Sequence, residues 1–217
     1  MRLQNVIFFF SFFQLNLTAS ASDASECLQR AQKAIKDDDP AAFAPIFRTD
    51  SGETSCDINA IIPDGSGQTL LMNAVLTGAG GGVVAILLAL GADATIGEKD
   101  GYTPIHGAGF QGRAAAARAL VATGGVDVDD VHKDGFTALQ RACWGREERH
   151  AQTVRVLLAL GADPRDMCRK DPGPGADGKV GETCRPLVDA TSNPLTKNIL
   201  RDHFARNKNR ANEETEL

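Results

Sequence analysis

Apolar and polar positions repeat along the middle of this chain with a period of 34 residues. In each copy, apolar residues recur at the three- and four-residue spacing of a helix, and a second apolar run that ends in glycine follows. The first runs begin at Thr69, Thr103 and Thr137, and the glycines that end the second runs are Gly91, Gly124 and Gly161. Self-similarity at a fixed period of this length is typical of stacked helical units, so the sequence predicts a solenoid rather than one globular core.

Each unit carries local signals for the start and the end of its helices. Threonine is a favourable N-cap residue, and glycine is favoured just beyond a helix C-terminus. In the first unit these signals predict helices over 69–76 and 83–90. Asp-Gly steps at 100–101 and 134–135 supply tight turns ahead of the next two units. Each unit therefore consists of a turn, a helix, a loop, a helix and a glycine, and the fold class expected is all-α.

One unit carries a motif with a known family pattern. Residues 101–108 read Gly-Tyr-Thr-Pro-Ile-His-Gly-Ala, which resembles the G-x-T-P-L-H-x-A motif of ankyrin repeats, and residues 87–93 are similar to the L-L-x-x-G-A-D end of such a unit. The other two copies of the first motif, 67–74 and 135–142, lack the Pro and the His. The resemblance to the ankyrin-repeat family implies an array of antiparallel helix pairs that binds other proteins. It also implies that His106 makes a hydrogen bond that ties adjacent hairpins together.

The resemblance extends in both directions and predicts an ankyrin-repeat solenoid of about five helix-turn-helix units over 22–206. The expected order is a cap at about 25–60, repeats at about 65–97, 98–131 and 132–165, and a divergent last repeat at about 179–206. In the cap we expect an inner helix over 25–35 and an outer helix over 41–47. The last outer helix is expected over 198–204.

Two segments depart from the repeat. The insertion at 169–178 is rich in Pro and Gly, which argues against either helix or strand over 171–178. Residues 207–217 form a polar tail that we expect to be disordered.

The first 21 residues have the features of a targeting signal. Arg2 gives a positive start, an apolar run follows over 6–17, and Ala19-Ser20-Ala21 is a small-residue cleavage site. The run is well short of the roughly 20 residues that span a bilayer. We therefore expect a cleaved signal peptide and an exported protein, in the periplasm, the ER lumen or outside the cell; an uncleaved anchor or a misplaced start remains the alternative.

The chain has five cysteines: Cys27, Cys56, Cys143, Cys168 and Cys184. Their spacing matches no zinc site or CxxC redox pair, so disulfides in an oxidising compartment are the expected use of four of them. In the repeat arrangement, a Cys27–Cys56 bridge would close the cap, and a Cys168–Cys184 bridge would join the base of the insertion. Each bridge would add about 2–4 kcal/mol of stability. Cys143 is expected to be a buried, inert thiol, with a reactive or intermolecular thiol as the alternative.

Charge and motifs argue against several classes of function. The net charge is -5, without a run of Lys and Arg, which disfavours nucleic acid as a partner. No segment beyond the first 21 residues is apolar enough to span a membrane. The G-x-G-x-x-G at 107–112 falls inside a helical unit with no strand before it, so it does not indicate a dinucleotide site. The four histidines lie far apart in sequence, and we expect no catalysis, cofactor or metal.

A column of large apolar residues is the best candidate for a binding surface. The position seven residues after each motif threonine is Leu76, Phe110 and Trp144. The family resemblance implies that partners bind along a concave face made from hairpin tips and the exposed side of the inner helices, and stacked units would align these residues there. A contiguous apolar patch favours an interface, and Trp is favoured at hot spots. The alternative is that they fill gaps between helices. The resemblance also implies further contacts at the helix end and the hairpin tips, namely Gln111, Glu98, Lys99, His132 and Lys133, with solvated turns as the alternative for the tip residues.

The sequence thus predicts an exported protein that binds another protein through its concave face and hairpin tips, without catalysis. Two other functions remain open. One is a redox-active or enzyme-associated factor that uses Cys143 or a labile disulfide. The other is a scaffold or an inhibitor subunit of an enzyme complex, since a fold of this kind does not by itself determine function.

Overall fold

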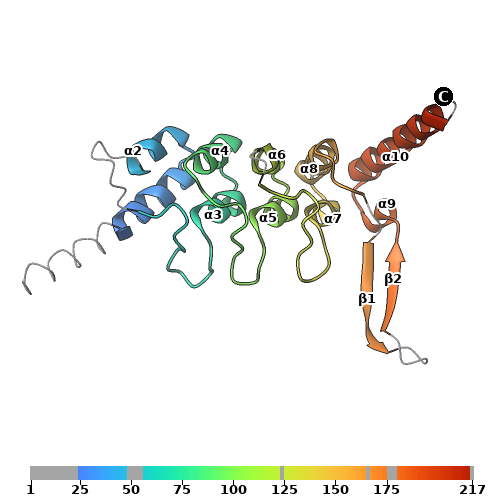
Figure 1. The fold of residues 1–217 in the computed structure, drawn as a ribbon, viewed down its shortest axis with the longest axis horizontal. Helices are drawn as coiled ribbons and strands as arrows, with labels where there is room; N and C mark the ends of the chain where they lie inside the picture. Colours follow the sequence, from blue (N-terminus) through green and yellow to red (C-terminus); the bar gives the residue numbers. More distant parts are fainter. Residues whose placement is uncertain (1–23, 48–55, 123–124, 165–166, 175–179, 216–217) are drawn as a thin grey trace, which may run out of the picture.

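The described residues form a row of antiparallel helix pairs, stacked in two layers (Figure 1). The computed structural model describes residues 24–47, 56–122, 125–164, 167–174 and 180–215, with the backbone alone for 167–174, 180–185 and 211–215. The inner layer contains α3 (Leu70–Thr77), α5 (Pro104–Gln111) and α7 (Ala138–Trp144). The outer layer contains α4 (Gly81–Ala89), α6 (Ala114–Ala122) and α8 (Glu148–Ala159). The predicted helical solenoid is confirmed.

The motif threonines act as N-caps in two of the three units. Thr69 Oγ1 accepts a hydrogen bond from the backbone N–H of Met72 at 3.2 Å, and Thr137 forms a reciprocal capping box with Gln140. At the other end of the inner helices, Gly78 closes α3 in the left-handed conformation that glycine adopts without strain. These local bonds explain why the inner helices are short and begin at a fixed position.

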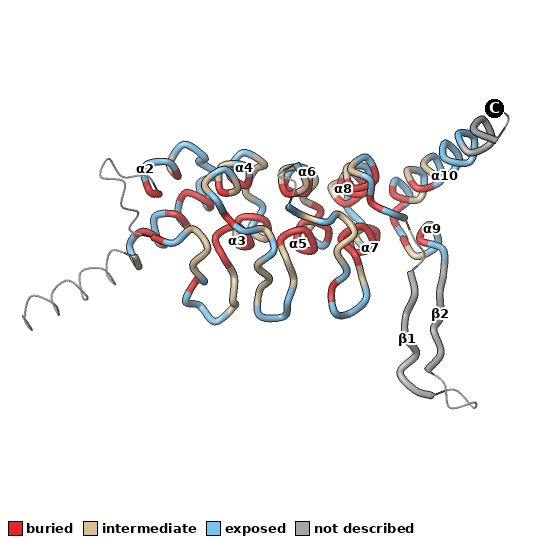
Figure 2. The backbone as a smooth tube through the Cα atoms, in the orientation of Figure 1, coloured by how far each residue is buried: buried red, intermediate tan, exposed pale blue. Residues whose placement is uncertain are grey.

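Neighbouring inner helices pack at close range because small residues lie between them. A Cβ on Gly109 of α5 would overlap the backbone of Ala138 at the start of α7, within 2.9 Å of its Cα. A Cβ on Gly107 would lie 3.2 Å from Cδ2 of Leu76 on α3. Gly107 and Gly109 of the G-x-G-x-x-G motif therefore serve helix packing. A continuous core of buried residues runs through both layers, and Figure 2 marks the buried positions in red.

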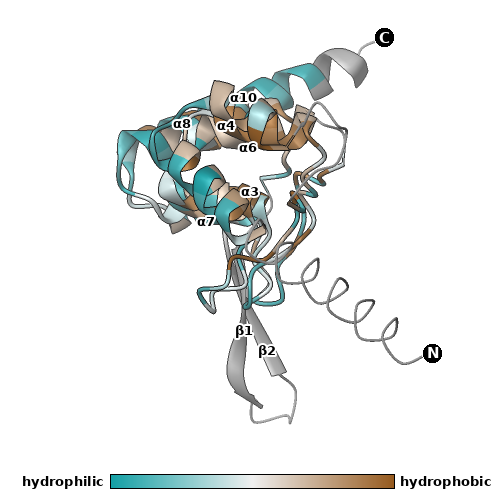
Figure 3. Cartoon of the chain, turned by 90° about the vertical axis from the view of Figure 1, so that its left-hand side faces the viewer, coloured by the Kyte–Doolittle hydropathy of each residue, from teal (hydrophilic) through white to brown (hydrophobic). Residues whose placement is uncertain are grey.

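The loops that precede successive units are tied together at the repeat spacing. Asp93 N–H donates to Asn59 Oδ1 at 2.8 Å, and Asp163 N–H donates to Asp129 Oδ1 at 3.0 Å. Both bonds link residues 34 positions apart. The view along the stack in Figure 3 shows these loops projecting on the side of the inner helices.

The N-terminal cap has the expected helices. Residues 24–36 are helical, and a 3-10 turn, η1 (Pro40–Ala42), leads into α2 (Phe43–Phe47). Cys27 and Cys56 form a disulfide with their Cα atoms 5.9 Å apart, which confirms the predicted pairing. The Asp38 carboxylate accepts a hydrogen bond from the backbone N–H of Gly80 at 2.6 Å, so the cap is bound to the first repeat as well.

The C-terminal part corrects two expectations. Strands β1 (Met167–Pro174) and β2 (Val180–Arg185) form an antiparallel hairpin, so the prediction that 171–178 excludes strand is wrong for the residues up to Pro174. The cross-strand ladder accommodates the Pro and Gly through an irregular register between Lys170 and Pro174. Residues 175–179 lie outside the described part.

The second correction concerns the polar tail. After the short helix α9 (Leu187–Ala190), helix α10 (Pro194–Thr215) continues well beyond the expected end at 204 and includes most of the tail. After its first residue α10 contains neither Pro nor Gly, and it is rich in Arg, Lys, Ala and Glu, which favour helix. Helix propensity therefore decided the structure here, although the tail offers few apolar residues to bury.

Within the part of the chain that the structure describes, no helix has both the length and the apolarity to cross a bilayer. The predicted signal peptide, 1–21, lies outside the described residues.

The close packing at Gly109 makes a testable prediction. Gly109→Ala should destabilise the fold by about 1–3 kcal/mol because the added methyl group has no room against α7. In an uncrowded helix the same change would be stabilising, so the sign of the effect reports the contact. Urea unfolding followed by circular dichroism measures it.

Gly125→Ala is the matched control, since a Cβ there meets no atom within 4 Å and the residue is exposed. Its stability should stay within about 0.5 kcal/mol of the parent. Equal stability of the two variants would contradict the packing argument.

Candidate protein-binding face

Two large aromatic side chains lie exposed on neighbouring inner helices. Phe110, near the end of α5, is 55% exposed, and Trp144, at the end of α7, is 37% exposed. The two occupy equivalent positions in helices that pack against each other, and packed helix axes lie roughly 8–10 Å apart. We call this pair the aromatic patch. Leu76, the third member of the predicted column, is half-buried and lies against Gly107, so it borders the patch with only part of its side chain.

The residues of the aromatic patch are held by neighbours on one side only. The Trp144 ring meets Phe136 edge-on, with centroids 5.0 Å apart, and the guanidinium of Arg141 lies 5.7 Å from its centroid. The backbone carbonyl of Phe110 accepts a hydrogen bond from His150 Nε2 at 3.2 Å. The backbones are therefore fixed while much of each ring stays in solvent.

A cationic group lies at the end of the same helix. Arg113 follows the cap glycine of α5, and its guanidinium lies over the preceding unit, where a Cβ on Gly78 would be 2.5 Å from its Cζ. Within the described residues its Nε is buried and has no hydrogen-bond partner. Burial lowers the pKa of Arg113, and repulsion from Arg149 adds to the effect while Glu147 opposes it. Arg113 is thus a partly desolvated cation suited to a carboxylate.

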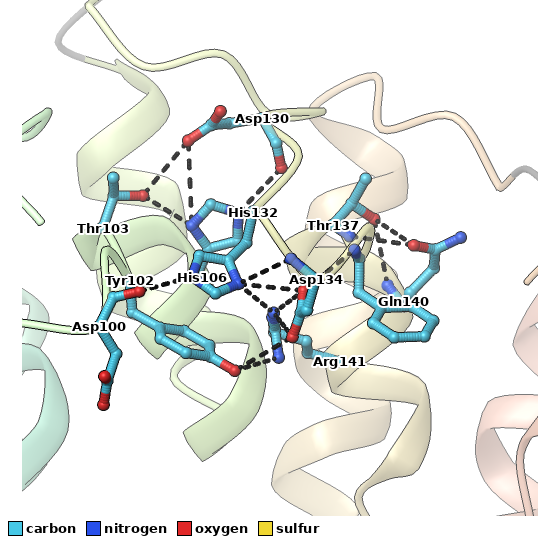
Figure 4. A network of polar contacts seen from close by, with 11 residues as sticks. Asp100, Tyr102, Thr103, His106, Asp130, His132, Asp134, Thr137, Gln140 and Arg141 are labelled. Carbon is cyan, nitrogen blue, oxygen red and sulfur yellow. Dashed lines mark hydrogen bonds and ion pairs between the residues drawn. The ribbon is translucent and has the colours of Figure 1, made fainter. Parts of the chain in front are cut away.

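Behind the aromatic patch, a buried polar network joins the second and third units (Figure 4). Arg141 is only 2% exposed, and its Nη2 donates to both carboxylate oxygens of Asp134 at 2.7 and 2.8 Å. Its Nη1 donates to the Tyr102 hydroxyl at 2.9 Å, and the guanidinium lies 4.3 Å from the centroid of that ring. The Tyr102 ring in turn stacks on His132 at 4.1 Å. A buried arginine is tolerated here because several of its donors are satisfied.

Asp134 is the anion that balances this arginine. Partial burial alone would raise its pKa, but hydrogen bonds from Arg141 and the Phe136 backbone, together with the His132 imidazole 3.0 Å away, outweigh burial and lower it from 3.8 to about 2. Asp134 is therefore ionised throughout the physiological range. The ion pair joins the turn before α7 to the helix itself.

The sequence model of the family described as ankyrin repeats, in three copies, matches residues 71–168. These residues are ankyrin repeats. No curated protein matches the chain significantly. The matched segment includes nearly all of the helices from α3 to α8, together with the aromatic patch and the network behind it.

His106 makes the hydrogen bond that the family resemblance implied. Its Nε2 donates to the backbone carbonyl of Asp130 at 2.9 Å, and its Nδ1 accepts from the Thr103 hydroxyl at 2.8 Å. The first bond links α5 to the loop that precedes the next unit. Because the Thr103 hydroxyl is engaged with the ring, it does not cap α5 as the other motif threonines cap their helices.

The prediction that His132 is an exposed contact residue is wrong. His132 was expected on an exposed hairpin tip, but it is 6% exposed, and its Nε2 donates to the backbone carbonyl of Asp100 at 2.9 Å. It therefore ties two ankyrin hairpins together. Lys99 and Lys133 are exposed at the tips, and Glu98 is half-buried. Gln111 is also half-buried, beside Phe110 in α5.

Cys143 is the residue on which the redox alternative depends. Cys143 is fully buried, and burial raises the pKa of its thiol to about 12, so the thiol is protonated and inaccessible at neutral pH. This argues against the redox alternative that uses Cys143. Among the described side chains, no group of three or more His, Cys, Asp and Glu is arranged to hold a metal ion.

Sequence reasoning missed Arg113 and Arg141. Neither shows a motif, and each gains its role from contacts with a neighbouring unit or turn. A weak signal existed for Arg141. Gly107 occupies the equivalent position in the unit before, and this position faces the packing surface between inner helices, where a charged residue is unexpected.

Buried His106 predicts a pH dependence of stability. Burial lowers its pKa below the ordinary histidine value of 6.5, against the opposing effect of Asp130. The unfolded chain therefore takes up a proton more readily than the folded one, so stability is retained above pH 6.5 and falls as the pH drops below it. Between pH 7.5 and 5.5, His106 lowers the free energy of unfolding by at most about 1.4 kcal/mol for each pH unit.

His106→Gln tests this, because Gln140 already occupies the equivalent position in the third unit. Urea unfolding at several pH values between 7.5 and 5.5 should show a shallower loss of stability for the variant than for the parent. Parallel curves for the two proteins would contradict the role given to His106.

Proposed function

We propose that this ankyrin-repeat domain binds a partner protein at the aromatic patch, with the hairpin tips as secondary contacts. The observation that carries the proposal is the exposure of Phe110 and Trp144 on adjacent inner helices. Ankyrin-repeat domains generally mediate protein–protein interaction and are typically non-catalytic. Exposed aromatic side chains that lie together favour an interface, and Trp is among the residues that most often dominate binding energy.

The surroundings of the patch indicate the chemistry of the partner. Arg113 offers a guanidinium whose buried Nε makes no hydrogen bond among the described residues, and Lys99 and Lys133 are exposed at the tips. A partner segment with apolar side chains and a carboxylate would satisfy both features. The Arg141 network fixes the backbone behind the patch, which lowers the ordering cost of binding.

A photo-crosslinking experiment tests the proposed face. The full chain would carry p-benzoylphenylalanine at position 110 in one sample, and at position 118 in the control. Arg118 is exposed on the outer helix α6, so the control samples the opposite layer. We expect a discrete protein adduct from position 110 and none from position 118.

The partner identified in this way allows affinities to be measured. Phe110→Ala and Trp144→Ala should each weaken its binding by tenfold or more, as expected for hot-spot residues, where roughly 2 kcal/mol or more is lost. Cooperative unfolding should be kept, with a larger stability loss for Trp144 because its ring also contacts Phe136. Equal adducts from both positions, or loss of cooperative unfolding in both alanine variants, would assign these residues to the core instead.

We also propose that the protein is exported, with residues 1–21 as the signal peptide. The Cys27–Cys56 disulfide supports an oxidising compartment. Cys168 and Cys184 are directly opposite each other in the β1–β2 register. Antiparallel partners have Cα atoms about 4.5–5.5 Å apart, within the range that a disulfide spans. The predicted Cys168–Cys184 bridge therefore remains part of the proposal.

Mass analysis of protein recovered from cells, alkylated with and without reduction, tests export and pairing together. We expect a mature N-terminus near Ser22, peptides linked as Cys27–Cys56 and Cys168–Cys184, and one free thiol at Cys143. That thiol should react only after denaturation, because it is buried.

Five free thiols on a chain with an intact N-terminus would overturn both export and the second bridge. Rapid reaction of Cys143 in the native protein would instead favour the redox function.

A further inference from the structure

A groove of about 350 Å³ lies between the outer helix α8 and the last helix α10. It is on the outer layer, away from the aromatic patch. Leu158 of α8 and Ile199 of α10 contribute an apolar base, and Leu158 is buried. Arg155 of α8 and Arg206 and Arg210 of α10 also line the groove. The groove therefore combines an apolar base with cationic walls from two different helices.

Among the side chains that the structure describes, the charged ones lining this groove are all positive, although the chain as a whole carries a net charge of -5. In the part of the chain whose side chains are described, Arg155 and Arg206 take part in no ion pair. Arg206 uses its Nε to bond the backbone carbonyl of Asp202 at 3.1 Å, which orients the side chain but leaves its charge unbalanced.

His203 reports the electrostatic state of the same groove. Its Nε2 accepts a hydrogen bond from the Asn207 side-chain amide at 2.9 Å, which leaves the protonated Nδ1 as a donor. Burial lowers the pKa of His203, and the charges of Arg206 and Arg210 lower it further. An anion bound between the arginines would counter that field and raise the pKa of His203. The imidazole is therefore an internal probe of occupancy.

We propose that this groove binds an anionic amphiphile, with its acidic headgroup between Arg155 and Arg206 and its apolar chain over Leu158 and Ile199. Guanidinium groups on opposite walls suit a phosphate or a carboxylate, since each can donate charge-assisted hydrogen bonds. The volume falls at the lower end of the range for small-molecule sites. A short groove lined by cations from two helices favours a single headgroup over an extended acidic peptide.

Monododecyl phosphate, used below its micellar concentration, is the probe for the full chain. We expect saturable binding by calorimetry and a weakening of about tenfold in Arg155→Gln and in Arg206→Gln, because each change removes a charge-assisted contact. Arg201→Gln is the matched control: Arg201 is exposed on the same helix and does not line the groove, so its variant should bind like the parent. Phe110→Ala should also bind like the parent, which separates this site from the aromatic patch.

NMR titration of His203 gives a second measurement. The pKa of its imidazole should rise when the probe is bound in the parent protein, and should respond less in Arg206→Gln. A rise in the Arg201→Gln control equal to that in the parent completes the expected pattern.

The controls distinguish the source of the headgroup and set the limits of the proposal. Binding of the monomeric probe alone indicates a free amphiphile, whereas binding of both the monomer and phosphatidylglycerol vesicles, with the same arginine dependence, indicates a lipid. Four results would each overturn the proposal. Two are that dodecanol, or inorganic phosphate, binds as tightly as monododecyl phosphate. The others are that Arg201→Gln weakens binding as much as the groove variants do, or that an acidic peptide needing the same arginines binds more tightly.

Discussion

The contact on which the rest of the structure depends is the close approach of neighbouring inner helices. Gly109 of α5 lies against the backbone of Ala138 in α7, at a distance that leaves no room for a side chain. At this spacing each helix pair buries its apolar face on the next pair, so a unit obtains its core only from its neighbours. The same spacing brings equivalent positions of successive units side by side, which places the exposed residues Phe110 and Trp144 on adjacent inner helices.

Polar contacts then hold the loops and turns between the units, which helix packing alone does not fix in position. His106 binds the loop before the third unit, His132 binds the turn before the second, and Arg141 joins Tyr102 to Asp134. These side chains are buried between the loops and the inner helices, so the hairpins form a rigid surface beside the aromatic patch. The inner face and the outer groove differ in this respect: Arg141 beside the first is paired with Asp134, whereas Arg155 and Arg206 make no ion pair among the described side chains.

Three features could be predicted from the sequence: the repeat, the helices of the N-terminal cap and the Cys27–Cys56 pairing. Each depends on residues close in sequence or on the regular offset of the units. His132 was misplaced since a turn motif gives no sign that the neighbouring hairpin covers it. The β1–β2 hairpin was missed because its stability comes from pairing between two segments, while Pro and Gly were judged one segment at a time. The arginines of the groove come from two helices that no repeat spacing relates, so their meeting could not be inferred before the structure.

The disulfide of the cap has a consequence for the order in which the stack comes apart. In a one-dimensional array the end units have a neighbour on one side only, and both ends are equally prone to fraying if nothing else holds them. Here the first unit is closed covalently by Cys27 and Cys56 and bonded to the next through Asp38. The far end is held by α9 and by a long polar helix that extends past the core. We therefore expect loss of structure to begin at the C-terminal end and to proceed inwards, with the N-terminal units remaining as a template on which the array can re-form.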